Sequence, residues 1–565
     1  MWQQNYEPVA GSLALSTVVA AIPIALLFVM LGVLRRPAWM AALTALAVAF
    51  LLALFAYGMP AQLALMSALT GAAYGLFPIS WIVFSSIMLY RLAVDTGKFE
   101  IIKDSVGGLT NDRRLQALFI AFSFGAFIEG AAGFGAPVAV SGAMLAGLGF
   151  PPFYAAGICL MANTAPVAFG SIGIPVTTLA GITGIPVLPL SAMVGRLCAM
   201  ISLIIPTYLV VVMAGWRKTA EVLPAVVICG VSFAAVQFYV SNYMGPELTD
   251  ILSSLSCIGA MVLVLKLWKP LTIFRLDGEK AATSSPHGHS AGQVFSAWLP
   301  YMLLVIFVLT WGEVAVKRSI DTFSNGLLPS FLPRSTTVLN GLTVPGLHNL
   351  VLRVPPVTPA PAPYAAIYTL NWLSSAGTAC FLAAIAAAIL LRVSPRRFLG
   401  VYRATFGPLA KSMLTIASML GLAYLMNYSG MTSTLGIALA ATGSTFPFFS
   451  AILGWLGVFL TGSDTSANAL LGNLQMITAN QIGLNPVLTT SVNSAAGVMG
   501  KMIALPSIAV AVAATGLTSE DEGKLFRFTL VHSVFLACVV GIVAMLFAYV
   551  FPSLVPTIHG LAPTR

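Results

Sequence analysis

The feature that most constrains this chain is the recurrence of apolar stretches of about 18–25 residues, each long enough to cross a hydrocarbon core about 30 Å thick. Only 8% of the 565 residues are charged, against roughly 25% in soluble domains. The stretches lack the alternation typical of barrel strands, so they favour helices. The six cysteines are isolated from one another and indicate neither a disulfide framework nor a metal site. We therefore predict an all-α polytopic membrane protein.

The basic residues predict the orientation of the chain, because short loops rich in Lys and Arg stay in the cytoplasm. Arg35 and Arg36 follow the first span, which places the N-terminus outside. The last span, near 527–550, is predicted to leave the C-terminus outside as well. The polar loop at 269–290 is predicted to be cytoplasmic and the proline-rich segment 319–363 external. The net charge of +10 therefore reflects topology and not nucleic-acid binding.

The chain also contains a weak internal repeat. "GAFIEG" at 125–130 resembles "GVFLTG" at 457–462, and "NTAPVAFG" at 163–170 resembles "NSAAGVMG" at 493–500. The basic loops give the matching segments opposite directions, so the two halves are predicted to be inverted. The predicted units are a first repeat over 1–214, linking spans and a cytoplasmic loop over 215–295, and a second repeat over 296–565.

Each repeat is predicted to hold one re-entrant hairpin and one broken helix. The hairpin tips lie near 129–135 and 461–468, where polar and glycine-rich residues separate short apolar segments. The broken helices lie near 163–170 and 493–500, where Pro and Gly would unwind the backbone. Irregular backbone at membrane depth is tolerated only where protein or a water-filled cavity covers it. About twelve transmembrane helices and two hairpins in inverted-topology repeats are the architecture of secondary transporters.

Two acids, Glu129 and Asp464, lie inside apolar regions at the two predicted tips. An ionisable group at that depth is costly and indicates a function. Desolvation also favours the protonated form of a carboxyl, which suits a proton carrier. We predict proton coupling for both, with an acid that accepts N–H bonds at its own tip as the alternative. Lys501 is a charge partner for Asp464, a substrate contact or a snorkelling side chain.

Neutral polar residues and glycines surround the predicted tips and breaks. Freed N–H groups at helix ends, together with hydroxyl and amide side chains, suit a small hydroxy-carboxylate. Interhelical packing is the alternative role for such residues. No hydrolase motif appears, so an enzyme is not predicted. The predicted substrate-binding residues are Asn163, Thr164, Ser463, Thr465, Ser466, Asn493, Ser494, Gly133 and Gly135.

Several long motifs resemble the lactate permease family, the bacterial carriers of L-lactate, D-lactate and glycolate. They are "FGAFIEGAAGFGAPVA", "NTAPVAFG", "GWLGVFLTGSDTS", "GKMI", "WQQNY", "GPEL" and "LFRFT". The resemblance implies import of these acids by proton symport across the bacterial cytoplasmic (inner) membrane. It also implies an elevator-like motion. No cofactor is expected, and the proton is the coupling ion. At 504–507 the chain reads "ALPS" where the family typically has Ser-Pro-Gln-Ser, so polar groups are missing beside the second break.

Four other functions fit parts of this pattern. A carboxylate exchanger or a sodium-coupled carrier could use the same fold, and uphill accumulation would distinguish a carrier from a channel. A membrane lactate sensor would need a sizeable output domain, for which the loop at about 269–295 is too short. The expected partners are the lipid bilayer and the small acid. The sequence leaves open the preferred acid, the proton stoichiometry, which acid carries the proton and the oligomeric state.

Overall fold

The computed structural model describes residues 1–107, 109–133, 135–276, 288–336 and 338–557. Twelve helices in this part of the chain are long and apolar enough to cross a membrane, or thirteen if a pair bent by 60° forms one span. The prediction of an all-α polytopic protein with about twelve membrane helices is confirmed. Parts of two predicted loops (277–287 and 337), position 134 of the first tip and residues 558–565 lie outside the described residues.

The first half of the chain is almost entirely helical. Short π-helical or 3₁₀ segments extend α1 (Val29–Val33), join α3 to α4 (Gly75–Ser80), join α6 to α7 (Ala117–Phe124) and precede α10 (Val167–Phe169). The helices are α1 (Leu13–Phe28), α2 (Ala38–Phe55), α3 (Ala61–Tyr74), α4 (Trp81–Asp95), α5 (Lys98–Gly107), α6 (Arg113–Gln116), α7 (Gly125–Ala131), α8 (Ala136–Gly147), α9 (Pro152–Ala162), α10 (Gly170–Thr183) and α11 (Val187–Ala220).

The second half of the chain is also mainly helical. Short 3₁₀ segments lie at Ala440–Thr445, Ser519–Asp521 and Pro552–Leu554. The helices are α12 (Leu223–Tyr243), α13 (Thr249–Leu267), α14 (Ala291–Gly312), α15 (Val314–Leu327), α16 (Ala376–Leu390), α17 (Pro395–Ser429), α18 (Met431–Leu439), α19 (Phe446–Thr461), α20 (Asp464–Gln481), α21 (Pro486–Lys501), α22 (Leu505–Thr515) and α23 (Glu522–Tyr549).

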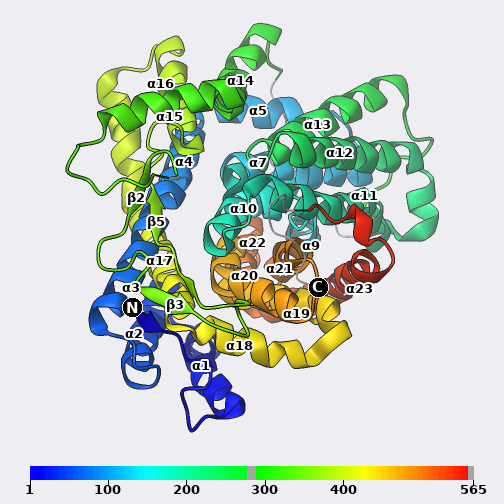
Figure 1. Ribbon diagram of the computed structural model, residues 1–565. Coiled ribbons are helices and arrows are strands. Elements are labelled where there is room, and N and C mark those ends of the chain that lie inside the picture. The colour runs from blue at the N-terminus through cyan, green and yellow to red at the C-terminus, as the bar shows by residue number, and fades with distance from the viewer. Residues whose placement is uncertain (108, 134, 277–287, 337, 558–565) are drawn as a thin grey trace.

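The helices gather in two groups (Figure 1). One group, on the left of the view, contains α1–α4 and α14–α17, with α17 packed along α2, α3 and α4. The other contains α7, α9–α13 and α19–α23, with α19 packed against α21 and α23. Contacts of α20 with α17 and of α10 with α4 join the groups. The elements that carry both predicted tips therefore belong to the second group.

The segment predicted as an external loop forms two small sheets. Strand β1 (Trp2–Gln3) pairs in parallel with β3 (Val351–Arg353), which pairs antiparallel with β4 (Ala362–Pro363). Strands β2 (Gly341–Thr343) and β5 (Ile367–Thr369) form the second sheet. Helix α16 begins at Ala376, after β5 and the N-cap Ser375. The sheets hold the N-terminus against this segment.

The predicted second break is wrong in position. Helix α21 continues through 493–500 as a regular helix and is interrupted only at 502–504, before α22. The helix stays regular at Gly497 and Gly500, and their missing side chains allow close packing against α19. A Cβ on Gly500 would lie 2.3 Å from the Trp455 carbonyl oxygen, and one on Gly497 would lie 2.7 Å from Val458 Cγ2. The first break matches the prediction, with α9 and the segment 167–183 bent by 60° at 163–166.

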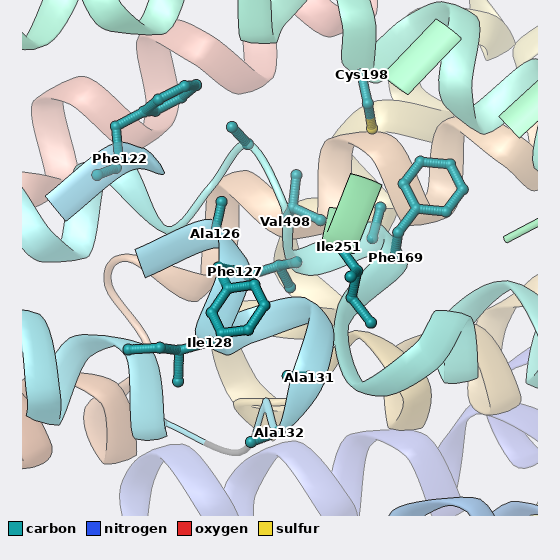
Figure 2. Packing of buried hydrophobic residues seen from close by; sticks show 14 of the residues in the cluster. Phe122, Ala126, Phe127, Ile128, Ala131, Ala132, Phe169, Cys198, Ile251 and Val498 are labelled. Atoms are coloured by element: carbon teal, nitrogen blue, oxygen red, sulfur yellow. The ribbon is translucent and has the colours of Figure 1, made fainter. Parts of the chain in front are cut away.

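Apolar side chains pack densely around α7. Figure 2 shows Phe127 and Ile128 of α7 together with buried side chains from other elements, among them Phe169, Ile251 and Val498. All of these side chains are at most 1% exposed. A polar group on α7 therefore contacts water only where it lines a cavity.

An ion-pair network holds the start of the α6–α7 segment. The fully buried Arg114 contacts Asp112 at 2.7 Å and Glu221 at 2.9 Å. Hydrogen bonds from Thr272, Lys218 and Arg114 lower the pKa of Glu221 to about 2. The network thus ties α6 to the end of α11 on the side where the basic loops lie.

Close helix contacts give the first prediction. A Cβ on Gly71 of α3 would lie 2.2 Å from the Leu420 carbonyl oxygen of α17, and overpacking costs about 1–3 kcal/mol. We expect Gly71→Ala to lower the thermal unfolding temperature of the detergent-solubilised protein by several degrees. Gly259→Ala is the matched control, because nothing lies within 4 Å of its added Cβ. Equal unfolding temperatures for the two variants would contradict this packing.

Candidate functional site

A cavity of about 220 Å³ lies between the two predicted hairpin tips. It contains three ionisable side chains, Glu129, Asp464 and Lys501. They come from α7 and, more than 300 residues later in the chain, from the consecutive helices α20 and α21. The remaining lining residues are Gly135, Val167, Gly170, Ser171, Ile174, Pro175, Thr461, Gly462, Ser463, Thr465, Pro506, Ser507 and Val510.

Four helix N-termini converge on this cavity. The lining includes Gly135, the N-cap of α8, Ser463, the N-cap of α20, and Ser507 in the first turn of α22. The regular part of α10 begins at Ile174 and Pro175, which also line the cavity. Each helix N-terminus carries about half a positive charge and free N–H groups. The cavity is therefore built to hold negative charge.

Glu129 is buried without a partner for its outer oxygen. Its side chain is 4% exposed, and Oε2 makes no hydrogen bond. Gly170 packs directly against the carboxyl, since a Cβ on this glycine would lie 2.5 Å from Oε1. Among the described residues, Oε2 accepts no N–H bond from its own tip. The carboxyl is therefore unsatisfied at one of its two oxygens.

Only one of the two carboxylate oxygens of Asp464 has hydrogen-bond partners among the described residues. Its Oδ2 accepts hydrogen bonds from Ser494 Oγ at 2.6 Å and from Asn468 Nδ2 at 3.4 Å, whereas Oδ1 has no partner. The side chain is 3% exposed. One oxygen is therefore fixed by the protein and the other is left for a ligand or a proton.

Lys501 lies at the end of α21, where the helix is interrupted. Its Nζ donates to the Gly462 carbonyl oxygen at 2.7 Å. Among the described residues, neither Glu129 nor Asp464 lies within 4.0 Å of it as an ion pair. The lysine thus shares the cavity with both acids without neutralising either one by direct contact.

The predicted substrate-binding residues divide into three groups. Gly135, Ser463 and Thr465 line the cavity. Ser494 and Asn493 lie behind it: Ser494 holds Asp464, and Asn493 donates to Asn468 Oδ1 at 2.9 Å.

The third group is placed differently from the prediction. Asn163, Thr164, Ser466 and Gly133 are absent from the lining. Thr164 donates to the Met161 carbonyl, and the N–H of Ser466 donates to Ser463 Oγ. The N–H of Gly133 donates to the Ile128 carbonyl, so it is not a free donor. Both side-chain polar atoms of Asn163 are buried and unpartnered at the first break.

Sequence reasoning missed Asn468, which joins the two halves of the site. Its amide nitrogen lies 3.2 Å from the Pro175 carbonyl oxygen of α10 and 3.1 Å from Ser494 Oγ. Polar residues four positions apart on a helix, as Asp464 and Asn468 are, share one face. This spacing could have predicted from the sequence that Asn468 lies beside Asp464.

Sequence reasoning also missed Asp250, a third buried acid. It is 1% exposed, and neither carboxylate oxygen has a hydrogen-bond partner. It packs on the turn that carries Glu129, since a Cβ on Gly130 would lie 2.8 Å from Asp250 Cβ. Acidic side chains are common in the first turn of a helix, so the position of Asp250 in α13 carried no signal of burial.

The start of α10 is strained beside the cavity. Ser171, Ile172 and Gly173 all have left-handed backbone angles, with φ of 46°, 60° and 69°. For a β-branched residue such as Ile172 this is a rare conformation that costs on the order of 1–3 kcal/mol. Ser171 Oγ donates to the Ala132 carbonyl at 2.8 Å and so ties the bend to the first tip. Strain of this kind is maintained where the surrounding structure requires it.

In the described part of the chain, twelve helices are long and apolar enough to span a membrane, and a cavity among them holds three ionisable groups. These features define a polytopic membrane protein with an internal polar site, the class that includes secondary transporters. A family model described as L-lactate permease matches residues 16–551. The chain belongs to this family.

Relatives of the chain are similar to it over nearly their whole length. The L-lactate permease of Bacillus subtilis is 49% identical, over 98% of this chain and 100% of the relative. Glycolate permease GlcA of Escherichia coli is 45% identical, over 97% and 98%. The E. coli L-lactate permease is 44% identical, over 98% and 100%. Among solved structures, MtrF of Neisseria gonorrhoeae aligns with a TM-score of 0.49 at 13% identity, over 93% of this chain and 97% of that one.

The unpartnered acid gives the second prediction. Burying a charged carboxylate without a donor is very costly, so we expect the Asp250 carboxyl to be neutral at pH 7. The infrared spectrum should contain a protonated-carboxyl band that Asp250→Asn removes, with an unfolding temperature within a few degrees of wild type. An unchanged band would contradict a neutral Asp250.

Proposed function

We propose that the protein imports L-lactate, together with D-lactate and glycolate, by proton symport across the bacterial cytoplasmic membrane. The observation that carries the proposal is the single cavity in which Glu129, Asp464 and Lys501 lie together beneath four helix N-termini. The names of the relatives support lactate and glycolate as substrates.

The charges of the cavity account for the coupling. With one of the two acids ionised beside Lys501, the three side chains are neutral, and an entering carboxylate would make the net charge −1. Concentrating negative charge in a low-dielectric site is costly. One proton taken up by Glu129 or Asp464 with each anion leaves the net charge of the site unchanged. Anion and proton therefore bind more easily together than either does alone.

The substrate carboxylate has suitable donors in the cavity. Lys501 and the N-terminus of α20 supply positive charge, and Ser463, Thr465 and Ser507 supply hydroxyl groups that can bond a 2-hydroxyl. The residues at 504–506 contribute no side-chain hydroxyl or amide there. This part of the wall favours a small acid with an apolar substituent.

An elevator-like motion of inverted repeats is part of the proposal. The internal sequence repeat supports this, since "GAFIEG" at 125–130 on α7 resembles "GVFLTG" at 457–462 at the end of α19. The group that carries the cavity is joined to the other group mainly through α20. Movement of one group along the other would carry the cavity from one side of the membrane to the other.

We propose that both termini lie outside. Gln4 donates to the carbonyls of Asn427 and Tyr428 at the end of α17, whose beginning carries Arg396 and Arg397. Asn485 at the start of α21 donates to the Pro556 carbonyl near the C-terminus. Basic residues at the opposite end of α17 favour a cytoplasmic location for that end.

The direct test is L-lactate uptake into proteoliposomes with an inward proton gradient and no sodium. We expect uphill uptake that a protonophore abolishes. Glu129→Gln should lose gradient-driven uptake while lactate counterflow survives. Uptake that ignores the gradient would contradict symport and favour an exchanger, and uptake that requires sodium would favour a sodium-coupled carrier. Binding without any transport would favour the lactate sensor.

Gly170 gives a sharper prediction for the geometry around Glu129. Its Cβ in Gly170→Ala would lie 2.5 Å from Glu129 Oε1. The added methyl would displace the carboxyl from its position, so we expect gradient-driven L-lactate uptake to fall severalfold or more. Gly259→Ala, with open space around the added methyl, should transport like wild type. Full activity in Gly170→Ala would mean that Glu129 is not held where the structure has it.

A further inference from the structure

A second cavity, of about 400 Å³, lies apart from the first. Its walls are the ends of α10, α17 and α20, the start of α18, and the strand segment around β3 and β4. Amide groups are prominent in the lining, with Asn427, Asn473, Asn480 and Gln481 on adjacent helices. The cavity is therefore polar and larger than the one around Glu129.

Arg353 is the one charged side chain among the described residues that line this cavity. Its guanidinium carbon lies 4.4 Å from the centre of the Tyr364 ring, which stacks on Tyr428 at 4.3 Å. Arg353 Nε is buried and has no hydrogen-bond partner. The aromatic stack thus holds a guanidinium whose donor is unused, and no acid lines the cavity to neutralise it.

The two cavities share two helices. We call the cavity around Glu129 the inner cavity and the cavity around Arg353 the outer cavity. Helix α10 contributes Pro175 to the inner cavity and Gly181 to the outer cavity. Helix α20 contributes Thr465 to the inner cavity and Asn473 to the outer cavity. A rise of 1.5 Å per residue puts Thr465 and Asn473 about 12 Å apart along α20. An anion in the outer cavity is therefore within roughly two helical turns of the inner one.

The outer cavity lies at the end of α17 opposite its basic start. Tyr424, Asn427 and Tyr428 line it, whereas Arg396 and Arg397 begin the helix about 45 Å away along its axis. Basic ends of spans face the cytoplasm. The cavity therefore opens on the external side, where an imported acid arrives.

We propose that the outer cavity is a binding site for the 2-hydroxymonocarboxylate anion, with Arg353 as its carboxylate ligand. The inference rests on the proposed function, since it assigns that substrate to a second site. A guanidinium binds a carboxylate through paired, charge-assisted hydrogen bonds. No acid lines this cavity, so the anion binds here without a proton and takes one up only in the inner cavity. The outer site raises the anion concentration at the entrance and sets the external KM.

The test is the initial rate of L-lactate uptake by intact cells, in which only the external face meets the substrate. Arg353→Gln should raise KM about tenfold, as expected for the loss of a charge-assisted hydrogen-bonded pair. Its maximal rate should stay within about twofold of wild type, because the site is not part of the transport step. Arg334→Gln is the matched control, because Arg334 is an exposed arginine of the same segment outside the cavity lining. It should keep the wild-type KM.

Several outcomes would overturn the proposal. An unchanged KM in Arg353→Gln, a lower maximal rate with an unchanged KM, or an equal rise in Arg334→Gln would each do so. If Arg353→Gln does not reach the membrane, Arg353→Lys decides: a severalfold rise in KM supports the site, and a wild-type KM overturns it. Failure of the wild type to take up L-lactate overturns the proposed function itself, whereas normal wild-type uptake with an unchanged variant KM removes only the outer site.

Discussion

The cost of placing charge in a low-dielectric interior is the constraint on which this structure depends. Glu129, Asp464 and Lys501 share one cavity, yet no ion pair within 4.0 Å joins the lysine to either acid in the described part of the chain. The four helix N-termini at the cavity distribute positive potential over it. Adding or removing one anion or one proton therefore changes the electrostatic free energy of such a site strongly.

Much of the surrounding fold serves to keep this site in place. Asn468 links α20 to α10 and α21, and Ser494 fixes one oxygen of Asp464. The left-handed bend at Ser171 and Ile172 brings Gly170 against Glu129, and the Ser171 hydroxyl ties the bend to the first tip. The outer cavity is lined by the same two helices, α10 and α20. Under the proposed function, the two cavities are successive binding sites for one anion.

The sequence predicted the helical fold, the two acids and part of the cavity lining, because an acid within an apolar segment has few structural explanations. It placed the second break wrongly, since a glycine in a helix marks either unwinding or close packing, and only the contacts of Gly497 and Gly500 with α19 distinguish them. Asp250 escaped notice because an acid at a helix start is ordinary. Arg353 lies on a short strand in a proline-rich segment, and its approach to α17 and α20 depends on long-range packing that no local pattern encodes.

The central claim is that one proton enters the inner cavity with each anion. The most direct measurement is the pH change when L-lactate is added to the purified protein in weakly buffered detergent solution near pH 7. The account predicts alkalinisation that saturates with binding, at about one proton taken up per lactate bound, and its loss in a variant that carries both Glu129→Gln and Asp464→Asn. Saturable lactate binding by the wild type without any proton uptake would contradict it.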